Sequence, residues 1–253
     1  MNILITGASR GIGHSTALLA GSKPNWNIGI NYLRDAHSAN SAVEEINTNN
    51  KTKTSSGGKA IALRGDISDE KDVHRIFSTF EEGVGGKIDG VVIKAGITAP
   101  ALPLVDMSVE RLKRMFDTNV LGAYLCAREA VRRIPQDSNG SIVIVSSGAS
   151  RLGSPNEYVD YAGSKGAMDT LTIGLSKELG PRGVRVNAVR PGVIRTEIHE
   201  KGTGDAGRVE RLGGQTPLGR AGEAEEVARA VVWLLGSEAS YVTGALLDVA
   251  GGR

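Results

Sequence analysis

Cysteine, aromatic residues and long apolar runs are all scarce in this chain of 253 residues. Its single cysteine, Cys126, excludes an intramolecular disulfide and any metal site built from several cysteines. No apolar run approaches the roughly 18 residues that a membrane span needs. Against two Trp, five Tyr and three Phe stand 34 glycines, which indicate many tight turns and close approaches of the backbone.

An excess of one charge is absent too, because 30 basic and 28 acidic residues leave a net charge of +2. We therefore expect neither nucleic acid nor a membrane as a partner. No basic stretch precedes an apolar segment at the N-terminus, so we expect no signal peptide and a cytoplasmic location. The composition, 40% hydrophobic and 23% charged, is that of a folded globular protein. No domain boundary is visible, and residues 1–253 are expected to form a single domain.

Short apolar runs alternate with longer helical patterns along the chain. The runs predicted as strands cover residues 3–5, 28–30, 60–63, 90–93, 141–145, 184–189 and 245–248. The patterns predicted as helices cover residues 12–23, 36–46, 108–134, 157–179 and 223–235, with a further helix opening at residues 68–70. Most of the strand segments are apolar throughout, as is typical of strands covered on both faces. The alternation predicts an α/β fold with one parallel sheet and helices on both faces.

Two polar segments stand out from this pattern. Residues 47–58 are rich in Asn, Thr, Ser and Gly, and we predict a solvated surface loop there. Residues 202–214 follow the sixth strand, where a sheet of this kind presents its ligand crevice. Either a mobile lid over a substrate or a plain loop fits that place.

A glycine-rich turn, Thr6 to Gly13, joins the first predicted strand to the first predicted helix. Glycines let the backbone approach a pyrophosphate closely, and the helix N-terminus supplies amide donors and the positive end of its dipole. The turn therefore predicts a dinucleotide site. Its expected contacts are Gly7, Ser9, Arg10, Gly11, Ile12 and Gly13.

The end of the second strand favours NADP over NAD as the cofactor. NAD-selective proteins of this fold place an acid there to bind the ribose 2′-hydroxyl, whereas this chain has Asn31, followed by Tyr32. Asn31, Tyr32 and Arg34 are the cofactor contacts expected at this place. Arg10 and Arg34 could grip a 2′-phosphate. The alternative is that both arginines are solvated surface charges, and Asp35 could weaken Arg34.

Tyr161 and Lys165 are four residues apart on a predicted helix and so share one face. A free phenol, with a pKa near ~10, is a poor acid–base catalyst at neutral pH. An ammonium about 4 Å away would favour the phenolate by on the order of 4 kcal/mol, roughly three pKa units before desolvation opposes it. The pair predicts a general acid/base for interconverting a hydroxyl and a carbonyl. Tyr158 has Ala162 at the same spacing and offers no such pair.

Five motifs, in this order and spacing, resemble those of the short-chain dehydrogenase/reductase family. They are the turn from Thr6 to Gly13, Asp66-Ile67, Asn119, Tyr161 with Lys165, and Pro191-Gly192. The resemblance extends from Ile3 to Gly252. It implies a single-domain Rossmann fold whose seven-stranded parallel sheet has the order 3-2-1-4-5-6-7, and a homotetramer or homodimer.

The resemblance also implies roles for individual residues. Tyr161 would be the acid/base, and Lys165 would hold the nicotinamide ribose. Ser147, in preference to Ser146, would bind the substrate oxygen, and Asn119 would kink its helix and hold a water for proton relay. The remaining cofactor contacts would be Asp66 and Ile67 at the adenine, Ala95 and Gly96 at the adenosine ribose, and Pro191, Gly192, Ile194 and Thr196 at the nicotinamide. No metal is expected, since the four histidines form no cluster with ligand spacing.

Lys94 departs from the family pattern. The family usually has Asn-Asn-Ala-Gly where this chain has Ile93-Lys94-Ala95-Gly96. The change bears on sheet stability or cofactor affinity, and the ammonium could instead reach a cofactor phosphate or ribose. Residues 151–161 resemble bacterial members labelled glucose-dehydrogenase-like, a label that says little about substrate.

The predicted function is an NADP-dependent carbonyl reductase or alcohol dehydrogenase acting on a small molecule. One alternative is a non-catalytic NADP(H)-binding protein of the same fold. Another is a sugar-nucleotide epimerase or dehydratase, which can share the Tyr/Lys pair. Such chains carry an added C-terminal substrate domain, whereas this one stops soon after its seventh predicted strand.

Overall fold

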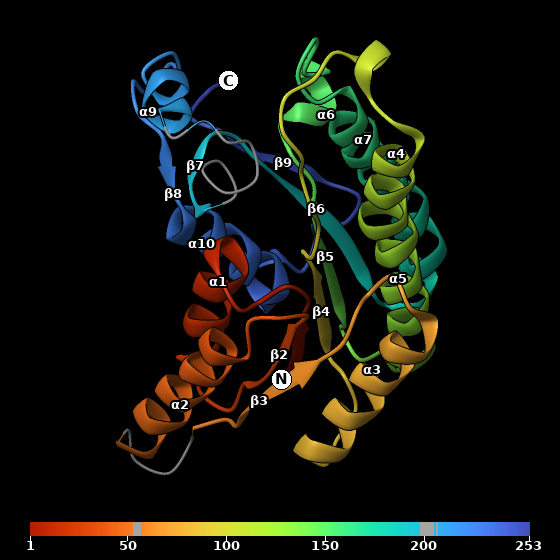
Figure 1. Ribbon diagram of the computed structural model, residues 1–253. Helices are drawn as coiled ribbons and strands as arrows, with labels where there is room; N and C mark the ends of the chain where they lie inside the picture. The colour runs from red at the N-terminus through yellow and green to blue at the C-terminus, as the bar shows by residue number, and fades with distance from the viewer. Residues whose placement is uncertain (53–56, 198–204, 206) are drawn as a thin grey trace.

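A parallel sheet of seven strands forms the centre of the molecule, in the order β3-β2-β1-β4-β5-β6-β9 (Figure 1). The computed structural model describes residues 1–52, 57–197, 205 and 207–253. The strands are β1 (Asn2–Ile5), β2 (Asn27–Tyr32), β3 (Ala60–Arg64), β4 (Gly90–Ile93), β5 (Ser141–Val145), β6 (Arg185–Pro191) and β9 (Leu246–Val249). The predicted fold class and strand order are confirmed, with β9 as the seventh strand of the sheet.

Helices cover both faces of the sheet, as Figure 1 shows. On one face lie α1 (Gly11–Gly21), α2 (Ala36–Thr52) and α10 (Ala224–Leu235). On the other lie α3 (Glu70–Val84), α4 (Val109–Phe116), α5 (Gly122–Arg133) and α7 (Val159–Leu179). The two short helices α6 (Ala149–Leu152) and α9 (Arg208–Gly213), and the small strands β7 (Ile194–Arg195) and β8 (Gly222–Glu223), lie beyond one end of the sheet (Figure 1).

The strands are buried on both faces because two separate apolar clusters sandwich the sheet. In β4, Val91 and Ile93 belong to the cluster under α3 and α5, whereas Val92 belongs to the cluster under α1 and α10. All four residues of β4 are buried. These strands show no alternation of polar and apolar residues because both of their faces are covered, as the sequence analysis predicted.

The chain order reverses at the pair β1 and β4. β2 and β3 lie on one side of β1, and β4, β5, β6 and β9 follow on the other. In open parallel sheets, ligands bind beyond the carboxyl ends of the strands at this reversal. The fold therefore directs attention to the segments that follow β1, β4, β5 and β6.

The helix predicted over residues 108–134 contains a widened turn. The Ser108 side chain caps α4 by accepting from the Arg111 amide at 3.2 Å. One π turn, Asp117–Leu121, then separates α4 from α5. Such turns are frequent at functional sites. Here the widening contains Asn119, which is buried.

The loop predicted over residues 47–58 is wrong in its first half. α2 continues to Thr52, because its apolar face extends to Ile46 and the next residue fastens it to β3. Asn47 accepts from the Ala60 amide at 2.8 Å and donates to the Ala60 carbonyl at 3.2 Å. Gly57 forms an isolated antiparallel bridge with Pro24. The remaining residues of that prediction, 53–56, lie outside the described part of the chain.

Candidate active site

The glycine-rich turn packs directly onto the end of β4. Gly7 has a φ of +63°, and a Cβ there would lie 2.8 Å from the Ala95 Cα. A Cβ on Gly13 would lie 2.6 Å from the Gly7 carbonyl oxygen. Both positions therefore exclude any side chain. Thr6 completes the junction, because its hydroxyl oxygen accepts from the amides of Lys94 and Ala95 at 2.9 and 3.1 Å.

The N-terminus of α1 is open to an anionic ligand. Arg10, its N-cap residue, makes no capping hydrogen bond with its side chain, and the first turn holds no acidic residue. The free amides of such a terminus and the positive end of the helix dipole favour a phosphate. The uncapped helix and the two side-chain-free glycines thus fit the diphosphate of a dinucleotide.

Asn31 lies behind the turn rather than in the crevice. Its Oδ1 accepts from the Gly7 amide at 3.2 Å, and its Nδ2 donates to the carbonyls of Leu63 and Gly65, both at 3.1 Å. The side chain is buried. Its polar atoms already have protein partners, so the geometry gives no support to Asn31 as a direct cofactor contact through its side chain.

The residues predicted to select NADP lie near the surface. Arg10 and Arg34 are exposed, and Tyr32 is half-buried between them in the sequence. An Arg10 Nη1 lies 3.5 Å from a Glu197 carboxylate oxygen. The pKa of the Asp35 carboxyl is lowered, mainly by a hydrogen bond from the Ser38 amide and in smaller part by the charge of Arg10. Asp35 therefore interacts electrostatically with Arg10.

Asp66 and Ile67 follow β3, as predicted. One Asp66 carboxylate oxygen, Oδ1, accepts from the amide and the hydroxyl of Ser68 at 2.9 and 2.7 Å. The Ile67 side chain is buried against Gly122 of α5. The adenine contact predicted for this pair stays a prediction.

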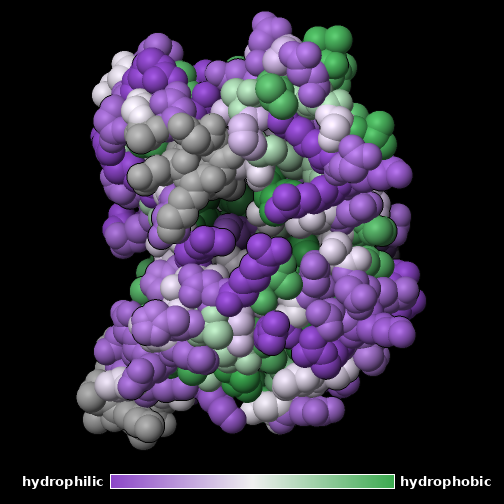
Figure 2. All heavy atoms as spheres, viewed as in Figure 1, coloured by the Kyte–Doolittle hydropathy of each residue, from purple (hydrophilic) through white to green (hydrophobic). Residues whose placement is uncertain are grey.

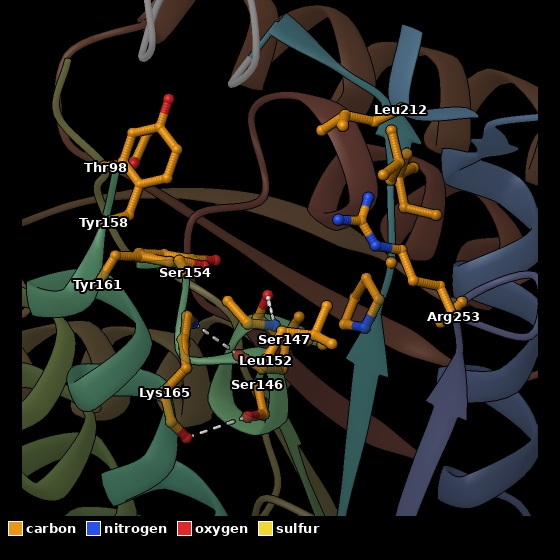
Figure 3. A pocket seen from close by; sticks show the side chains of 18 of the residues that line it. Thr98, Ser146, Ser147, Leu152, Ser154, Tyr158, Tyr161, Lys165, Leu212 and Arg253 are labelled. Carbon is orange, nitrogen blue, oxygen red and sulfur yellow. Dashed lines mark hydrogen bonds between the residues drawn. The ribbon is translucent and has the colours of Figure 1, made fainter. Parts of the chain in front are cut away.

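Tyr161 and Lys165 lie one turn apart on α7, and both line a cavity of about 500 Å³ (Figure 3). The Lys165 Nζ is 5.7 Å from the centroid of the Tyr161 ring. It also donates to the Val145 carbonyl, at the end of β5, over 2.8 Å. Figure 2 shows the molecular surface hollowed, with apolar side chains visible inside the hollow.

The pKa of Tyr161 differs from the sequence-based expectation. Burial raises the pKa of the phenol above its ordinary value of 10.0, and a hydrogen bond with Ser147 opposes this only in part. The expected lowering by Lys165 is wrong for the protein without ligands. The reason is the burial of the phenol itself, which disfavours the charged phenolate. Burial also lowers the pKa of Lys165, to about 8. The expected lowering of about three pKa units came from the attraction between the ammonium and the phenolate alone, before desolvation.

The structure separates the two adjacent serines. Ser146 is buried, and its hydroxyl donates to the Lys165 carbonyl at 3.1 Å, so it fastens β5 to α7. Ser147 is less buried and lines the cavity, where its Oγ accepts from the Ala149 amide at 3.1 Å. The preference for Ser147 as the residue that faces a substrate fits this geometry (Figure 3).

Asn119 is almost fully buried and ties α4–α5 to the segment after β4. Its Oδ1 accepts from the Ile97 amide at 2.7 Å, and its Nδ2 donates to the Ile97 carbonyl at 2.9 Å and to the Ser164 hydroxyl at 3.1 Å. A Cβ on Gly96 would lie 3.0 Å from Asn119 Oδ1 and 3.8 Å from Lys165 Nζ. Gly96 therefore lies close to both Asn119 and Lys165, and the role of Asn119 in a proton relay stays a prediction.

The segment after β6 forms the facing wall of the cavity. The predicted nicotinamide contacts Pro191, Gly192, Ile194 and Thr196 all line it. A Cβ on Gly192 would lie 2.7 Å from the Ala250 Cα, so this wall packs against the C-terminal segment. A Cβ on Gly11 would lie 3.4 Å from Thr196 Cγ2. The start of α1 thus faces this wall across a narrow gap.

Some lining residues were not predicted from the sequence. Glu157, Tyr158, Arg208 and Leu212 all line the cavity. Arg208 and Leu212 belong to α9, so part of the predicted loop or lid over residues 202–214 is helical. Its residues 202–204 and 206 lie outside the described part of the chain. The pairing of Glu157 with Arg208 joins residues 51 apart, and no local pattern could have indicated it.

Comparison with known proteins decides the family. A family model described as "Enoyl-(Acyl carrier protein) reductase" matches residues 7–253. The chain is 48% identical to "Uncharacterized oxidoreductase YgfF" of Escherichia coli over 99% of this chain and 98% of the relative. The chain belongs to the short-chain dehydrogenase/reductase family. It is accordingly an oxidoreductase.

Other members of the short-chain dehydrogenase/reductase family match over nearly the whole length. "L-rhamnose 1-dehydrogenase (NAD(P)(+))" of Sphingomonas is 36% identical over 99% of this chain and 94% of its own. A short-chain dehydrogenase from Burkholderia cenocepacia, solved in complex with NADP, is 29% identical. It superposes with a TM-score of 0.88 over 99% of this chain and 96% of the other.

Neither a metal cluster nor a membrane-spanning helix is present in the described part of this short-chain dehydrogenase/reductase. Among the described residues, no three His, Cys, Asp or Glu side chains come together as a metal ion would require. Of the helices in the described ranges, none combines the length and apolar character needed to cross a bilayer.

Proposed function

We propose that the protein is an NADP(H)-dependent oxidoreductase that interconverts a carbonyl and a secondary alcohol by hydride transfer, with Tyr161 as the general acid/base. The observation that carries the proposal is the meeting of Tyr161, Ser147 and Lys165 in one cavity. The same cavity reaches Ile12, next to the open N-terminus of α1. The proposed acid–base and dinucleotide sites would thus share one cavity.

The residues that would hold the dinucleotide lie along the carboxyl edge of the sheet. The turn from Gly7 to Gly13 would hold the diphosphate, and the segment from Pro191 to Thr196 the nicotinamide. Asp66, Ile67, Ala95 and Gly96 would bind the adenosine, though Asp66 already receives two hydrogen bonds from Ser68. When bound, the dinucleotide supplies or accepts the hydride.

The protein's own groups would manage the proton. Tyr161 donates its phenolic proton to the carbonyl oxygen in the reducing direction and takes it back in the oxidising direction. Ser147 hydrogen-bonds the same oxygen and orients it toward the phenol. Lys165 donates to Val145, which leaves two of its N–H groups for the ribose hydroxyls. Asn119, which like Lys165 lies close to Gly96, would hold the water of the proton relay.

The preference for NADP rests on charge at the end of β2. No acid stands there, the Asn31 amide is engaged by protein partners, and Arg10 and Arg34 are exposed. A guanidinium can bind a phosphate through two hydrogen bonds. Michaelis constants for the two cofactors test this, and a tenfold preference for NAD would contradict it.

The decisive experiment measures NADPH oxidation against a panel of ketones, aldehydes and keto-sugars, with Tyr161→Phe as the control. General acid/base groups contribute about 10²- to 10⁴-fold, so Tyr161→Phe should lose at least about 100-fold in kcat. It should still bind NADPH and keep its melting temperature. Wild-type turnover in Tyr161→Phe would overturn the proposal.

A non-catalytic NADP(H)-binding protein is the second candidate, because Lys94 stands beside the glycine-rich turn where the family usually has an asparagine. It predicts tight NADPH binding with no turnover of any carbonyl in the panel. The same experiment therefore separates the two candidates.

We further propose a cytoplasmic homotetramer or homodimer. Large apolar side chains are exposed along α4, the π turn and α5, among them Val109 at 59%, Phe116 at 43% and Tyr124 at 43%. Such a row of apolar residues on two consecutive helices is costly in water and fits a subunit contact. Light scattering coupled to size exclusion tests it, and a monomer at micromolar concentration would contradict it.

A further inference from the structure

Lys94 lies at the junction of the glycine-rich turn and the end of β4. Its amide donates to the Thr6 hydroxyl oxygen at 2.9 Å, and its Nζ donates to the Gly7 carbonyl at 3.2 Å. The side chain is partly buried and lines the same cavity as Ile12 and Lys165. The ammonium is therefore held over the turn that opens α1, facing the interior of the cavity.

The two charged side chains that are electrostatically coupled to Lys94 in the described part of the chain, Arg10 and Lys165, have its own sign. Arg10 acts on Lys94, and Lys94 acts on Lys165, in each case lowering the pKa of the affected lysine. Burial is the larger cause and brings the pKa of Lys94 to about 8. No carboxylate of the described residues forms an ion pair with it. A buried ammonium without a counter-ion destabilises a folded protein, and an anionic ligand would remove that cost.

One hydrogen bond leaves the ammonium with unused donors. An ammonium has three N–H groups, and Gly7 takes one of them. The nearest feature that attracts an anion is the uncapped N-terminus of α1, which begins four residues after Gly7. Arg10 stands at that terminus, so the described cations Arg10, Lys94 and Lys165 follow the crevice from the turn to the acid–base pair.

We propose that Lys94 binds the diphosphate of the dinucleotide, as a cationic partner to the backbone amides at the start of α1. This rests on the proposed function, since it takes a nicotinamide dinucleotide as the ligand. If Lys94 binds the diphosphate, it should strengthen the binding of NADPH and of NADH equally, because both contain this group. Arg10, in contrast, would act on the 2′-phosphate and so on NADPH alone.

The test compares dissociation constants of Lys94→Met, Lys94→Arg and Arg10→Met for four ligands, with the apo-protein's melting temperature as the fold control. NADPH and NADH are followed by fluorescence, and ADP-ribose and AMP by calorimetry. ADP-ribose has the diphosphate without the nicotinamide, whereas AMP lacks the diphosphate. Lys94→Met removes the charge and keeps most of the side chain's length.

We expect Lys94→Met to weaken NADPH, NADH and ADP-ribose by about tenfold each, the loss of one charge-assisted hydrogen bond, and to leave AMP unchanged. The ratio of the NADH to the NADPH dissociation constant should stay as in the wild type. Lys94→Arg should keep most of the affinity. Arg10→Met should weaken NADPH and spare NADH.

Three results would overturn the assignment. They are unchanged affinities in Lys94→Met, a loss confined to NADPH, and an equal loss for AMP, which would place the contact on the adenosine. If Lys94→Met melts well below the wild type, Lys94→Arg decides, because affinity lost despite the retained charge contradicts the proposal. A wild-type protein that binds neither NADPH nor NADH would instead refute the proposed function.

Discussion

Arg208 forms a two-bonded ion pair with Glu157 in the lining of the cavity. Its Nη1 and Nη2 lie 3.0 and 2.7 Å from the two carboxylate oxygens of Glu157. The guanidinium also lies over the Tyr158 ring, 4.9 Å from its centroid. Because Arg208 begins α9 and Glu157 precedes α7, this pair fastens α9 to the segment that leads into α7, the helix of Tyr161 and Lys165.

We expect Arg208→Met to raise KM for the carbonyl substrate by roughly fivefold or more, since two charge-assisted hydrogen bonds that hold one wall are lost. The effect on kcat should be smaller, because no reacting atom is touched. Arg211→Met is the matched control, as Arg211 lies on the same helix and pairs with Asp205 at 2.5 Å outside the cavity lining. Equal KM values in the two variants would contradict a role for the Glu157 pair.

Removal of one partner from the buried pair of Arg111 and Asp160 should destabilise the fold. The Arg111 Nε lies 2.8 Å from Asp160 Oδ2, and the Asp160 side chain is fully buried directly before Tyr161. Arg111→Met leaves that carboxylate without its partner, at a cost of about 3–5 kcal/mol in the free energy of unfolding. Urea unfolding measures the change.

Arg229→Met serves as the control, since Arg229 pairs with Glu225 on the exposed side of α10. Pairs of that kind contribute only about 0.3–0.5 kcal/mol. A double variant, Arg111→Met with Asp160→Asn, should recover part of the stability that Arg111→Met loses. If it does not, the uncompensated charge is not the cause of the loss.

Gly7→Ala should abolish dinucleotide binding, because the added Cβ would collide with the Ala95 backbone at 2.8 Å. Gly85→Ala separates this collision from the strain of the backbone angle. Gly85 has a similar φ, +67° against +63°, but a Cβ there meets nothing within 4 Å. Gly85→Ala should cost about 1–2 kcal/mol in stability and leave the dissociation constant for NADPH unchanged. Similar binding by both variants would show that the turn can shift.

The stability of the apo-protein should depend on Lys94 in one window of pH. Its pKa falls from 10.5 to about 8 on folding, so between these values the unfolded chain holds more protons and stability rises with pH. The penalty from Lys94 is complete below about pH 8 and gone above 10.5. Lys94→Met should therefore melt higher than the wild type, by a margin that shrinks as the pH rises through this window. A margin that grows would contradict this sign.

The parts of the molecule that depend on local pattern were predictable from the sequence. Apolar runs such as β4 placed the sheet correctly, and the spacing of Tyr161 and Lys165 placed both residues one turn apart on a single helix. Long-range pairings were not predictable, since Asn47 extends α2 only because Ala60 lies beside it in the fold. The direction of the Tyr161 pKa shift depends on burial, which spacing does not report.

Asn31 has a consequence for how cofactor choice could change in this chain. NAD-selective proteins of this fold have an acid at the end of the second strand, yet an acid at residue 31 of this chain would remove the amide that donates to Leu63 and Gly65. Each carbonyl orphaned in this way costs about 1–3 kcal/mol. Substitution of residue 31 would therefore destabilise the fold, because its hydrogen bonds hold the backbone behind the turn. A change of preference toward NAD, whether by laboratory evolution or by drift, should begin at the solvent-exposed Arg34 and leave residue 31 unchanged.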